Sequence, residues 1–361
     1  MPSSRLRVYQ YLPHLKKHGI EGTALPALPE PWFSRFYYSR SKWVRGAQYL
    51  AEFFRNLWRV LESRRYDLVY VQKGILTTNV RFQENFLKKF SRRFVFDLDD
   101  EVYGNLIVEF RWPFLRRLQD PHQTEKLSSL SRAVVAGNRH LRDLALRYNP
   151  RVFVIPTPVD TDRFRPALPL TPSLSPLGRG EDEGKREIVL GWMGIPAGLD
   201  YLAPLAPVFQ ELSHRYPIRL RLVTRKPDPV WEVPGVKIEW VPWVYGSEVE
   251  SAGAFDIGLS PLADDEWTRG KCGLKLLQYM AMGLASVSSR VGANLDIVEE
   301  GVDGFLATEA GEWLKKLSLL IEDAALRKRM GEAARKKAEE KFSLKKTAPQ
   351  LAEVLKEVCQ S

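Results

Sequence analysis

The 361-residue sequence predicts an α/β protein made of two successive halves, each built around a mostly parallel sheet. Apolar runs typical of buried strands alternate with segments of helical periodicity, which is the pattern of βαβ units. The segment 165–187 interrupts this alternation with prolines and glycines, so it indicates a flexible linker or a surface insertion. Since a chain of this length exceeds what one core usually holds, we expect two domains.

The first half contains four predicted strands. Residues 5–18 place apolar side chains at helical spacing and end at Gly19, which predicts an amphipathic helix. A second helical region is expected over 35–63. A further helix is expected after the third strand, ending near Tyr148. The strands are expected at 66–72, 92–100, 131–137 and 151–159.

The second half begins again with a strand. Strands are expected at 187–193, 218–224, 236–241, 255–262 and 285–289. Helices are expected at 199–215 and 273–283, and a charged helical segment runs from Trp313 to about Val358. The expected organisation is a first domain over 1–164, the linker or insertion over 165–187, a second domain over 188–344, and a C-terminal helix over 345–361 that crosses back to the first domain.

Composition excludes several classes of protein. Hydrophobic residues make up 44% and charged residues 27% of the chain, the profile of a soluble globular protein. The two cysteines, Cys272 and Cys359, are too few for a disulfide scaffold or a multi-cysteine zinc site. No run of about 18 uncharged apolar residues occurs, and the N-terminus lacks the apolar segment of a secretory signal. These features favour a reduced, cytoplasmic protein.

Positive charge is concentrated in the first quarter of the chain. Residues 1–93 hold 18 Lys and Arg against 6 Asp and Glu, while the rest holds 36 against 38. Nucleic acid, anionic lipid and phosphorylated substrates are the candidate partners, and a solvated basic face is the alternative. Residues 35–63 interleave basic and aromatic side chains, the composition of an interfacial membrane helix. No nucleic-acid motif accompanies them, and a core-facing aromatic stripe is the other interpretation.

The stretch WTRGKCGLKLLQYMAMG, 267–283, is the most informative one for chemistry. It follows a predicted strand, and a glycine-bearing loop opens a helix at about Gly273. A helix N-terminus offers backbone N–H groups and partial positive charge to a phosphate. Arg269, Lys271 and Lys275 add positive charge there. The alternative is a buried helix whose basic residues are solvated.

This stretch also carries a family resemblance. Together with the following VGANLDIVEEGVDGFLA, it resembles the donor-binding region of retaining glycosyltransferases of family 4. RVFVIPTPVDTDRFRP resembles the segment that closes their N-terminal domain, and SSRLRVYQYLPHLKKHGIE resembles their first helix. The resemblance implies the GT-B fold, two Rossmann-like domains facing across a cleft, with a nucleotide-sugar bound mainly to the second. The first strand of the N-terminal domain, with its glycine loop, is expected to be missing.

The resemblance also implies a donor site. Gln278 stands where the family has a glutamate that contacts the ribose, and Gly270 stands where another glutamate contacts the sugar. Asp264, Asp265 or Glu266 are candidates to replace the latter contact. Lys275, Lys271 and Arg269 are expected to stabilise the diphosphate, without a protein nucleophile. The expected donor-binding residues are Gly194, Ile195, Arg225, Lys226, Gly273, Leu274 and Gln278.

The acceptor is expected on the first domain. Arg5 lies in the segment that resembles the first helix, and Asp97, Asp99 and Asp100 lie at the carboxyl end of the predicted strand 92–100. Such carboxylates suit acceptor hydroxyls, while a helix N-cap with an acidic first turn is the alternative.

The function implied is therefore a metal-independent, retaining hexosyltransferase that uses a nucleotide-sugar and a glycan or lipid-linked acceptor. No cofactor and no nucleic acid are expected, and the expected location is the cytoplasm, at the inner face of an anionic membrane. The alternatives are a non-catalytic GT-B protein that binds nucleotide or glycan, and a sugar-nucleotide epimerase.

Overall fold

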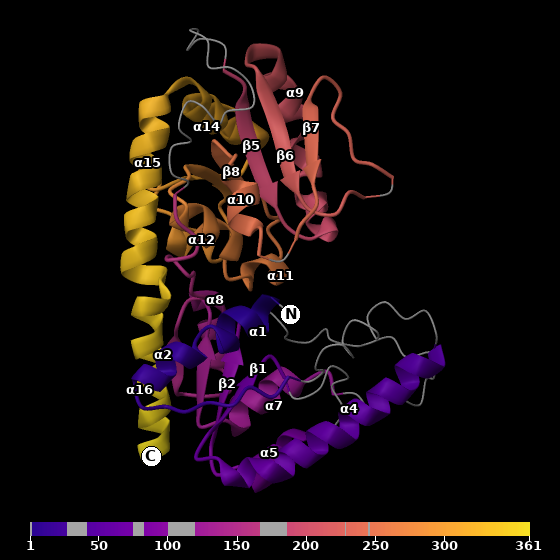
Figure 1. Cartoon of the computed structure of the whole chain (residues 1–361), viewed down its shortest axis with the longest axis vertical. Helices are drawn as coiled ribbons and strands as arrows, with labels where there is room; N and C mark the ends of the chain where they lie inside the picture. The colour runs from indigo at the N-terminus through magenta and orange to yellow at the C-terminus, as the bar shows by residue number, and fades with distance from the viewer. Residues whose placement is uncertain are drawn as a thin grey trace. The chain divides into compact units, whose positions relative to one another are not determined.

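The computed structural model describes residues 2–26, 42–74, 83–99, 120–166, 186–227, 229–244 and 246–361. The chain divides into two compact units, each with its own parallel sheet (Figure 1). Unit 1 comprises Met1–Thr157, Gly270–Cys272 and Thr347–Ser361. Unit 2 comprises Pro158–Arg269 and Gly273–Lys346. The predicted α/β class with two parallel sheets is confirmed.

The sheet of unit 1 has four parallel strands in chain order. They are β1 (Val69–Gln72), β2 (Phe94–Leu98), β3 (Ala133–Ala136) and β4 (Val152–Val154). Every residue of the two central strands, β2 and β3, is buried. Strands that are buried along their whole length are expected where a parallel sheet is covered on both faces. Each of the four lies inside a range in which the sequence predicts a strand.

Helices surround this sheet. They are α1 (Pro2–Ser4), η1 (Arg5–Tyr9), α2 (Leu12–Lys17), α4 (Lys42–Glu62), η2 (Ser63–Arg65), α5 (Gln83–Phe90), α7 (Gln123–Leu130), α8 (Arg139–Ala145) and α16 (Leu344–Gln360). The predicted helix over 5–18 is two pieces, η1 and α2, and it stops at Gly19, whose φ is +77°. The predicted second helix begins at Lys42 among the described residues, and 35–41 lie outside them.

Unit 2 has a six-stranded parallel sheet with the order β10-β9-β8-β5-β6-β7. Its strands are β5 (Ile188–Met193), β6 (Ile218–Val223), β7 (Lys237–Val241), β8 (Ile257–Ser260), β9 (Ser286–Ser289) and β10 (Phe305–Ala307). The chain runs outward from β5 to β7 and then continues on the other side of β5 with β8. The junction of β5 and β8 is therefore the topological switch point of a doubly wound sheet. The sequence did not predict the short strand β10.

The helices of unit 2 form two groups. Alternate residues of β5 belong to different apolar clusters, so they face opposite sides of the sheet. One cluster holds Phe209 and Leu317 from α9 and α14, and the other holds Leu276 and Ala334 from α12 and α15. The helices are η4 (Pro196–Tyr201), η5 (Ala203–Leu205), α9 (Ala206–Arg215), α10 (Glu248–Ala252), α11 (Glu266–Arg269), α12 (Leu274–Ala281), α13 (Asn294–Ile297), α14 (Ala310–Glu322), α15 (Ala324–Lys337) and η6 (Ala338–Phe342).

Two predicted helices of the second half are divided. The range 199–215 contains 3₁₀ turns as far as Leu205, and α9 starts only beyond them. The charged segment from Trp313 is not continuous, because Asp323 is extended and its side chain accepts a 2.7 Å hydrogen bond from the Leu326 N–H, which caps α15. Of the predicted linker or insertion, residues 167–185 lie outside the described part of the chain.

Candidate functional site

Strands β5 and β8 separate toward their carboxyl ends. They pair only through Leu190 with Ile257 and Gly191 with Gly258. Beyond this pairing the Tyr279 hydroxyl bridges them, since it accepts a 3.3 Å bond from the Met193 N–H and donates a 3.2 Å bond to the Leu259 carbonyl. Ligands of doubly wound sheets bind outside the carboxyl ends of the strands at such a switch point.

Helix α12 begins at this edge with a glycine that no other residue could replace easily. The φ of Gly273 is +64°, and a Cβ there would lie 2.5 Å from Ile297 Cδ1. Leu277 N–H donates to the Gly273 carbonyl at 3.0 Å, the first bond of the helix. The N–H groups of a first turn have no acceptor within their own helix, and the helix dipole makes that end partly positive. This end of α12 therefore suits a phosphate.

Lys275 is positioned by Trp192 at the same edge. Its Nζ lies 4.3 Å from the centroid of the indole ring, a cation–π contact. Trp192 is fully buried, and its Nε1 has no hydrogen-bond partner among the described residues. A Cβ at Gly194 or Gly198 would lie 2.8 or 2.9 Å from the ring, so both glycines give it room.

The other residues that the sequence predicts to bind a donor follow neighbouring strands or lie on α12. Ile195, after β5, is 71% exposed. Arg225 and Lys226, beyond the end of β6, are exposed, and Gln278 on α12 is buried. Because β8, β5 and β6 are adjacent and parallel, the structure brings these residues to one edge of unit 2. This group, the donor edge, consists of Gly194, Ile195, Arg225, Lys226, Gly273, Leu274, Lys275 and Gln278.

Arg269 does not supply unpaired positive charge. Its Nε donates to Asp264 Oδ1 at 2.7 Å, and both side chains are about half exposed, at 47% and 60%. The hydrogen bond from Arg269 lowers the pKa of Asp264. Asp265, for its part, accepts a 2.7 Å bond from the Thr268 N–H. Each of these three side chains thus has a local partner in the structure, and their roles toward a donor stay predictions.

Lys271 belongs to a short segment of unit 1. Asn138 Nδ2 donates to the carbonyls of Gly270 and Lys271 at 3.0 and 3.1 Å. The Cys272 thiol donates to the Asp99 carbonyl at 2.9 Å. Residues 270–272 are therefore held by the end of β2 and the start of α8. Lys271 is thus assigned to a different unit from Lys275.

A polar group lies at the carboxyl ends of β1 and β2 in unit 1. Asp99 is 6% exposed, accepts a 3.1 Å bond from Gln72 Nε2, and lies 3.8 Å from Lys73 Nζ. Ser4 Oγ donates to Gln72 Oε1 at 3.1 Å. Lys73 has a φ of +65°, the one positive value at a non-glycine position among the described residues. Such strain is common at functional sites.

This acceptor-side group, Ser4, Gln72, Lys73 and Asp99, overlaps the sequence prediction only at Asp99. Gln72 and Lys73 were missed, although Lys73–Gly74 directly after a strand was a usable indication of a special turn. Arg5, the other predicted acceptor-side residue, lies in η1 of the same unit. Asp100 lies outside the described residues.

Asp97, expected at a strand end, lies inside β2 and is fully buried. Arg7 Nε donates to its Oδ2 at 3.1 Å, and a second bond pairs Arg7 Nη2 with Oδ1. Arg7 Nη1 also donates to the Ile155 carbonyl at 2.7 Å. Burial alone would lower the pKa of Arg7, but the Asp97 carboxylate raises it above its ordinary value. The expectation of a ligand-binding or helix-capping Asp97 is therefore corrected to a buried ion pair.

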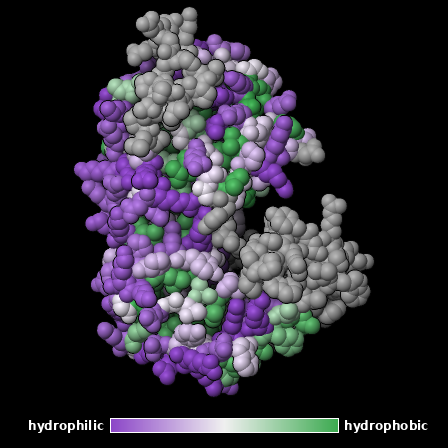
Figure 2. Space-filling model, viewed as in Figure 1, coloured by the Kyte–Doolittle hydropathy of each residue, from purple (hydrophilic) through white to green (hydrophobic). Residues whose placement is uncertain are grey.

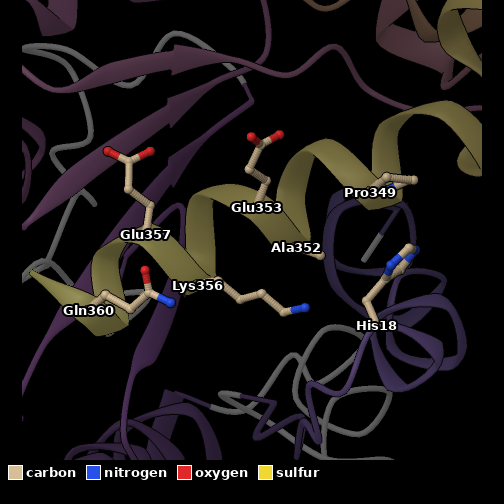
Figure 3. A pocket seen from close by; sticks show the side chains of 7 residues that line it. All are labelled: His18, Pro349, Ala352, Glu353, Lys356, Glu357 and Gln360. Atoms are coloured by element: carbon tan, nitrogen blue, oxygen red, sulfur yellow. The ribbon is translucent and has the colours of Figure 1, made fainter.

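One pocket lies outside both the donor edge and the acceptor-side group. A shallow pocket of about 430 Å³ lies on α16 of unit 1, and Figure 3 shows Glu353 and Glu357 on one side of the helix and Lys356 toward the other. It contains none of the predicted site residues. In the described ranges, no three His, Cys, Asp or Glu side chains are grouped so that they could hold a metal ion.

Comparison with known proteins finds a family similarity in the second half. The sequence model of the family described as glycosyl transferases group 1 matches residues 187–323, which contain the whole donor edge. No curated protein matches the chain in sequence. Residues 187–323 are thus similar to glycosyl transferases group 1.

Solved structures resemble the chain over most of its length. HepE from Anabaena in complex with UDP has a TM-score of 0.63 at 16% identity, covering 84% of this chain and 82% of that one. Sucrose-phosphate synthase from Thermosynechococcus elongatus has 0.61 at 13%, covering 94% and 82%. A glycosyltransferase from Rickettsia africae has 0.60 at 17%, covering 96% and 87%. These similarities show the fold, that of GT-B glycosyltransferases.

Proposed function

We propose that the protein is a glycosyltransferase that takes a sugar from a nucleotide-sugar donor bound at the donor edge of unit 2. The observation that carries the proposal is the Gly273-capped start of α12 beside Lys275, at the switch point of the sheet. A diphosphate matches this combination of helix dipole, first-turn N–H groups and a fixed cation. The family match over the same residues supports it, and HepE has been crystallised with UDP and with UDP-glucose.

We further propose a retaining, metal-independent transfer of a hexose. The acceptor hydroxyl attacks the anomeric carbon on the face from which the diphosphate leaves, so no protein nucleophile is needed. Lys275 and the N-terminus of α12 stabilise the charge that develops on the leaving group. Gln278 hydrogen-bonds to the ribose in this proposal. Arg225 and Lys226 contact the nucleotide from the end of the neighbouring strand, β6. Positioning and electrostatic stabilisation supply most of the rate.

The acceptor in this proposal is a glycan or a lipid-linked sugar. The acceptor-side group of unit 1 presents hydrogen-bond donors and acceptors at the carboxyl ends of β1 and β2, which suit sugar hydroxyls. We place the reaction in the cytoplasm, at the inner face of the membrane.

The test is release of the nucleoside diphosphate from a panel of nucleotide-sugars, with and without simple glycan acceptors. We expect turnover with at least one donor, unchanged activity in EDTA, and an anomeric configuration in the product, measured by NMR coupling constants, that matches the donor. Inversion would contradict the retaining mechanism, and loss of activity in EDTA would contradict metal independence.

The second candidate is a protein that binds nucleotide or glycan without transfer. It is favoured by Gly270, which has no side chain to contact the donor sugar, and by the local partners of Asp264 and Asp265. Calorimetric binding of UDP or a nucleotide-sugar together with absence of turnover across the panel would select this candidate.

A further inference from the structure

From Leu50 onward, where its side chains are described, helix α4 buries polar residues and exposes large apolar ones. Glu52 and Asn56, at 1% and 5% exposed, lie on the buried face. Large apolar side chains point outward instead: Leu50 is 59%, Phe54 60%, Trp58 62% and Leu61 41% exposed. A surface helix ordinarily turns its apolar side chains to the core, so this arrangement needs a reason outside the core of unit 1.

The outward side chains form one continuous stripe. Leu50, Phe54, Trp58 and Leu61 follow one another at intervals of four, four and three residues, which places them on one side of an α-helix. We call them the α4 stripe. Val60, whose position falls on the opposite side, is 4% exposed and joins the core of unit 1. In Figure 2, hydrophobic and hydrophilic residues both face the viewer over this helix.

Positive charge surrounds the C-terminal end of the stripe. Residues 50–67 and 83–93 hold eight Lys and Arg against four Asp and Glu, and two of these acids, Glu52 and Glu84, are buried. Arg65 is 79% exposed. Lys88 and Lys89 on α5, which packs against α4, are also exposed. Arg64 stacks over the Phe90 ring of α5 at 4.3 Å, so basic and aromatic groups share this surface.

We propose that the α4 stripe lies in the interface of an anionic membrane, with Trp58 and Phe54 among the lipid headgroups and the basic residues against the lipid phosphates. Aromatic and aliphatic side chains flanked by Arg and Lys are the composition that binds there. A second copy of the chain would bring like charges together. Binding of a nucleic acid would account for the basic residues but not for the exposed leucines. None of the helices that the structure describes is long and apolar enough to cross a membrane, so the contact is a surface one. This inference does not depend on the transfer reaction.

The experiment is flotation of the full-length protein with lipid vesicles. Vesicles of phosphatidylcholine with about 30% phosphatidylglycerol carry a negative surface potential, and pure phosphatidylcholine vesicles do not. We expect binding to the anionic vesicles at low salt, a large loss at about 0.5 M salt where charges are screened, and little binding to the neutral ones. Trp58→Glu should lower the partition coefficient about tenfold or more. Arg64→Glu with Arg65→Glu should lower it by a similar factor.

Matched variants separate the stripe from general effects. Leu319→Glu on α14 alters an apolar side chain that is 41% exposed, and Lys328→Glu on α15 reverses a cation that is 79% exposed. Both lie in unit 2 and should bind like the wild type. Trp58→Phe keeps an aromatic side chain, and it should reduce the quenching of tryptophan fluorescence by brominated lipid if Trp58 enters the bilayer.

Three results would overturn the proposal. One is absence of binding to anionic vesicles at low salt by wild-type protein that is folded by circular dichroism. Another is equal binding by wild type and Trp58→Glu, together with unchanged quenching in Trp58→Phe. The third is a concentration-dependent dimer in light scattering that Trp58→Glu dissociates while vesicle binding is absent, because the stripe would then be the contact between two copies.

Discussion

At the scale of single residues, the donor edge depends on side chains whose neighbours fix them in place. Lys275 rests on the Trp192 ring, and Trp192 in turn fits only because Gly194 and Gly198 lack side chains. Arg269, the last residue of α11 and four residues before the Gly273 cap of α12, is instead paired with Asp264. Equal formal charges close together in sequence therefore have different partners.

Lys275→Ala should weaken nucleoside diphosphate binding more than Lys271→Ala does. A charge-assisted contact is worth about 1.5–3 kcal/mol, so the first variant should lose roughly tenfold or more in affinity. Lys271 belongs to a segment of the other unit and should matter less. Calorimetric titration with UDP measures both, with Lys328→Ala as the control for loss of a surface charge. Equal losses in the two variants would contradict the assignment of Lys275.

The buried ion pair of unit 1 also makes a residue-scale prediction. Arg7 and Asp97 are 1% and 0% exposed, so Arg7→Met leaves a buried carboxylate without its partner. This variant should lower the free energy of unfolding by about 3–5 kcal/mol. The double variant Arg7→Met, Asp97→Leu removes both charges and should recover part of that loss. Urea unfolding measures both free energies. A double variant no more stable than Arg7→Met would contradict the attribution of the loss to an unpaired buried carboxylate.

At the scale of elements, Tyr279 on α12 joins two strands that diverge. Its ring needs the space left by Gly258, where a Cβ would lie 2.5 Å away, and Phe255 meets it edge to face at 6.1 Å. Phe255 likewise occupies the space over Gly191. These two glycine–aromatic pairs let α12 approach the sheet closely, and its N-terminus is thereby held at the switch point.

Tyr279→Phe should keep the packing of the ring and remove only the hydroxyl bridge. The buried Met193 N–H would lose its acceptor, which costs about 1–3 kcal/mol of stability. Tyr216→Phe is the matched control, because the Tyr216 hydroxyl bonds Glu322 at the surface, and it should change stability by less than about 0.5 kcal/mol. Thermal and urea unfolding distinguish them. Equal stabilities would mean that the hydroxyl bridge contributes nothing.

At the scale of the whole molecule, both units contain tyrosines whose hydroxyl groups are buried. Burial raises the pKa of Tyr11 in unit 1 to about 12, and it raises the pKa of Tyr70 in unit 1 and of Tyr279 in unit 2 as well. In the unfolded chain these hydroxyls lose their protons near pH 10. Above that pH the folded protein binds more protons than the unfolded one, so its stability falls as pH rises.

Tyr11→Phe should therefore make the protein less sensitive to alkaline pH. Between about pH 10 and pH 12, one such hydroxyl lowers the stability by about 1 kcal/mol per pH unit. Urea unfolding at pH 8 and at pH 11 should show a smaller difference for Tyr11→Phe than for the wild type. Parallel losses in the two proteins would mean that Tyr11 ionises as easily in the folded state as in the unfolded one.

The sequence alone was sufficient for the fold class and for most strands, because buried parallel strands are continuous apolar runs and the switch between strand and helix periodicity is local. It also predicted the start of α12 at Gly273, because a glycine after a strand and before a helical pattern has a local conformational cause. Short elements such as β10, with three residues, are too brief to leave a periodic pattern.

Only the tertiary structure decided which of the candidate side chains are available for chemistry. Asp97 and Asp99 are two residues apart at the end of β2. Asp97 is neutralised by Arg7, which is distant in sequence, whereas Asp99 lies beside Lys73. The same holds for α4, whose alternation of aromatic and basic residues fits either orientation of the helix. Which face is buried depends on what the rest of unit 1 packs against it, and long-range packing of that kind leaves no local pattern in the sequence.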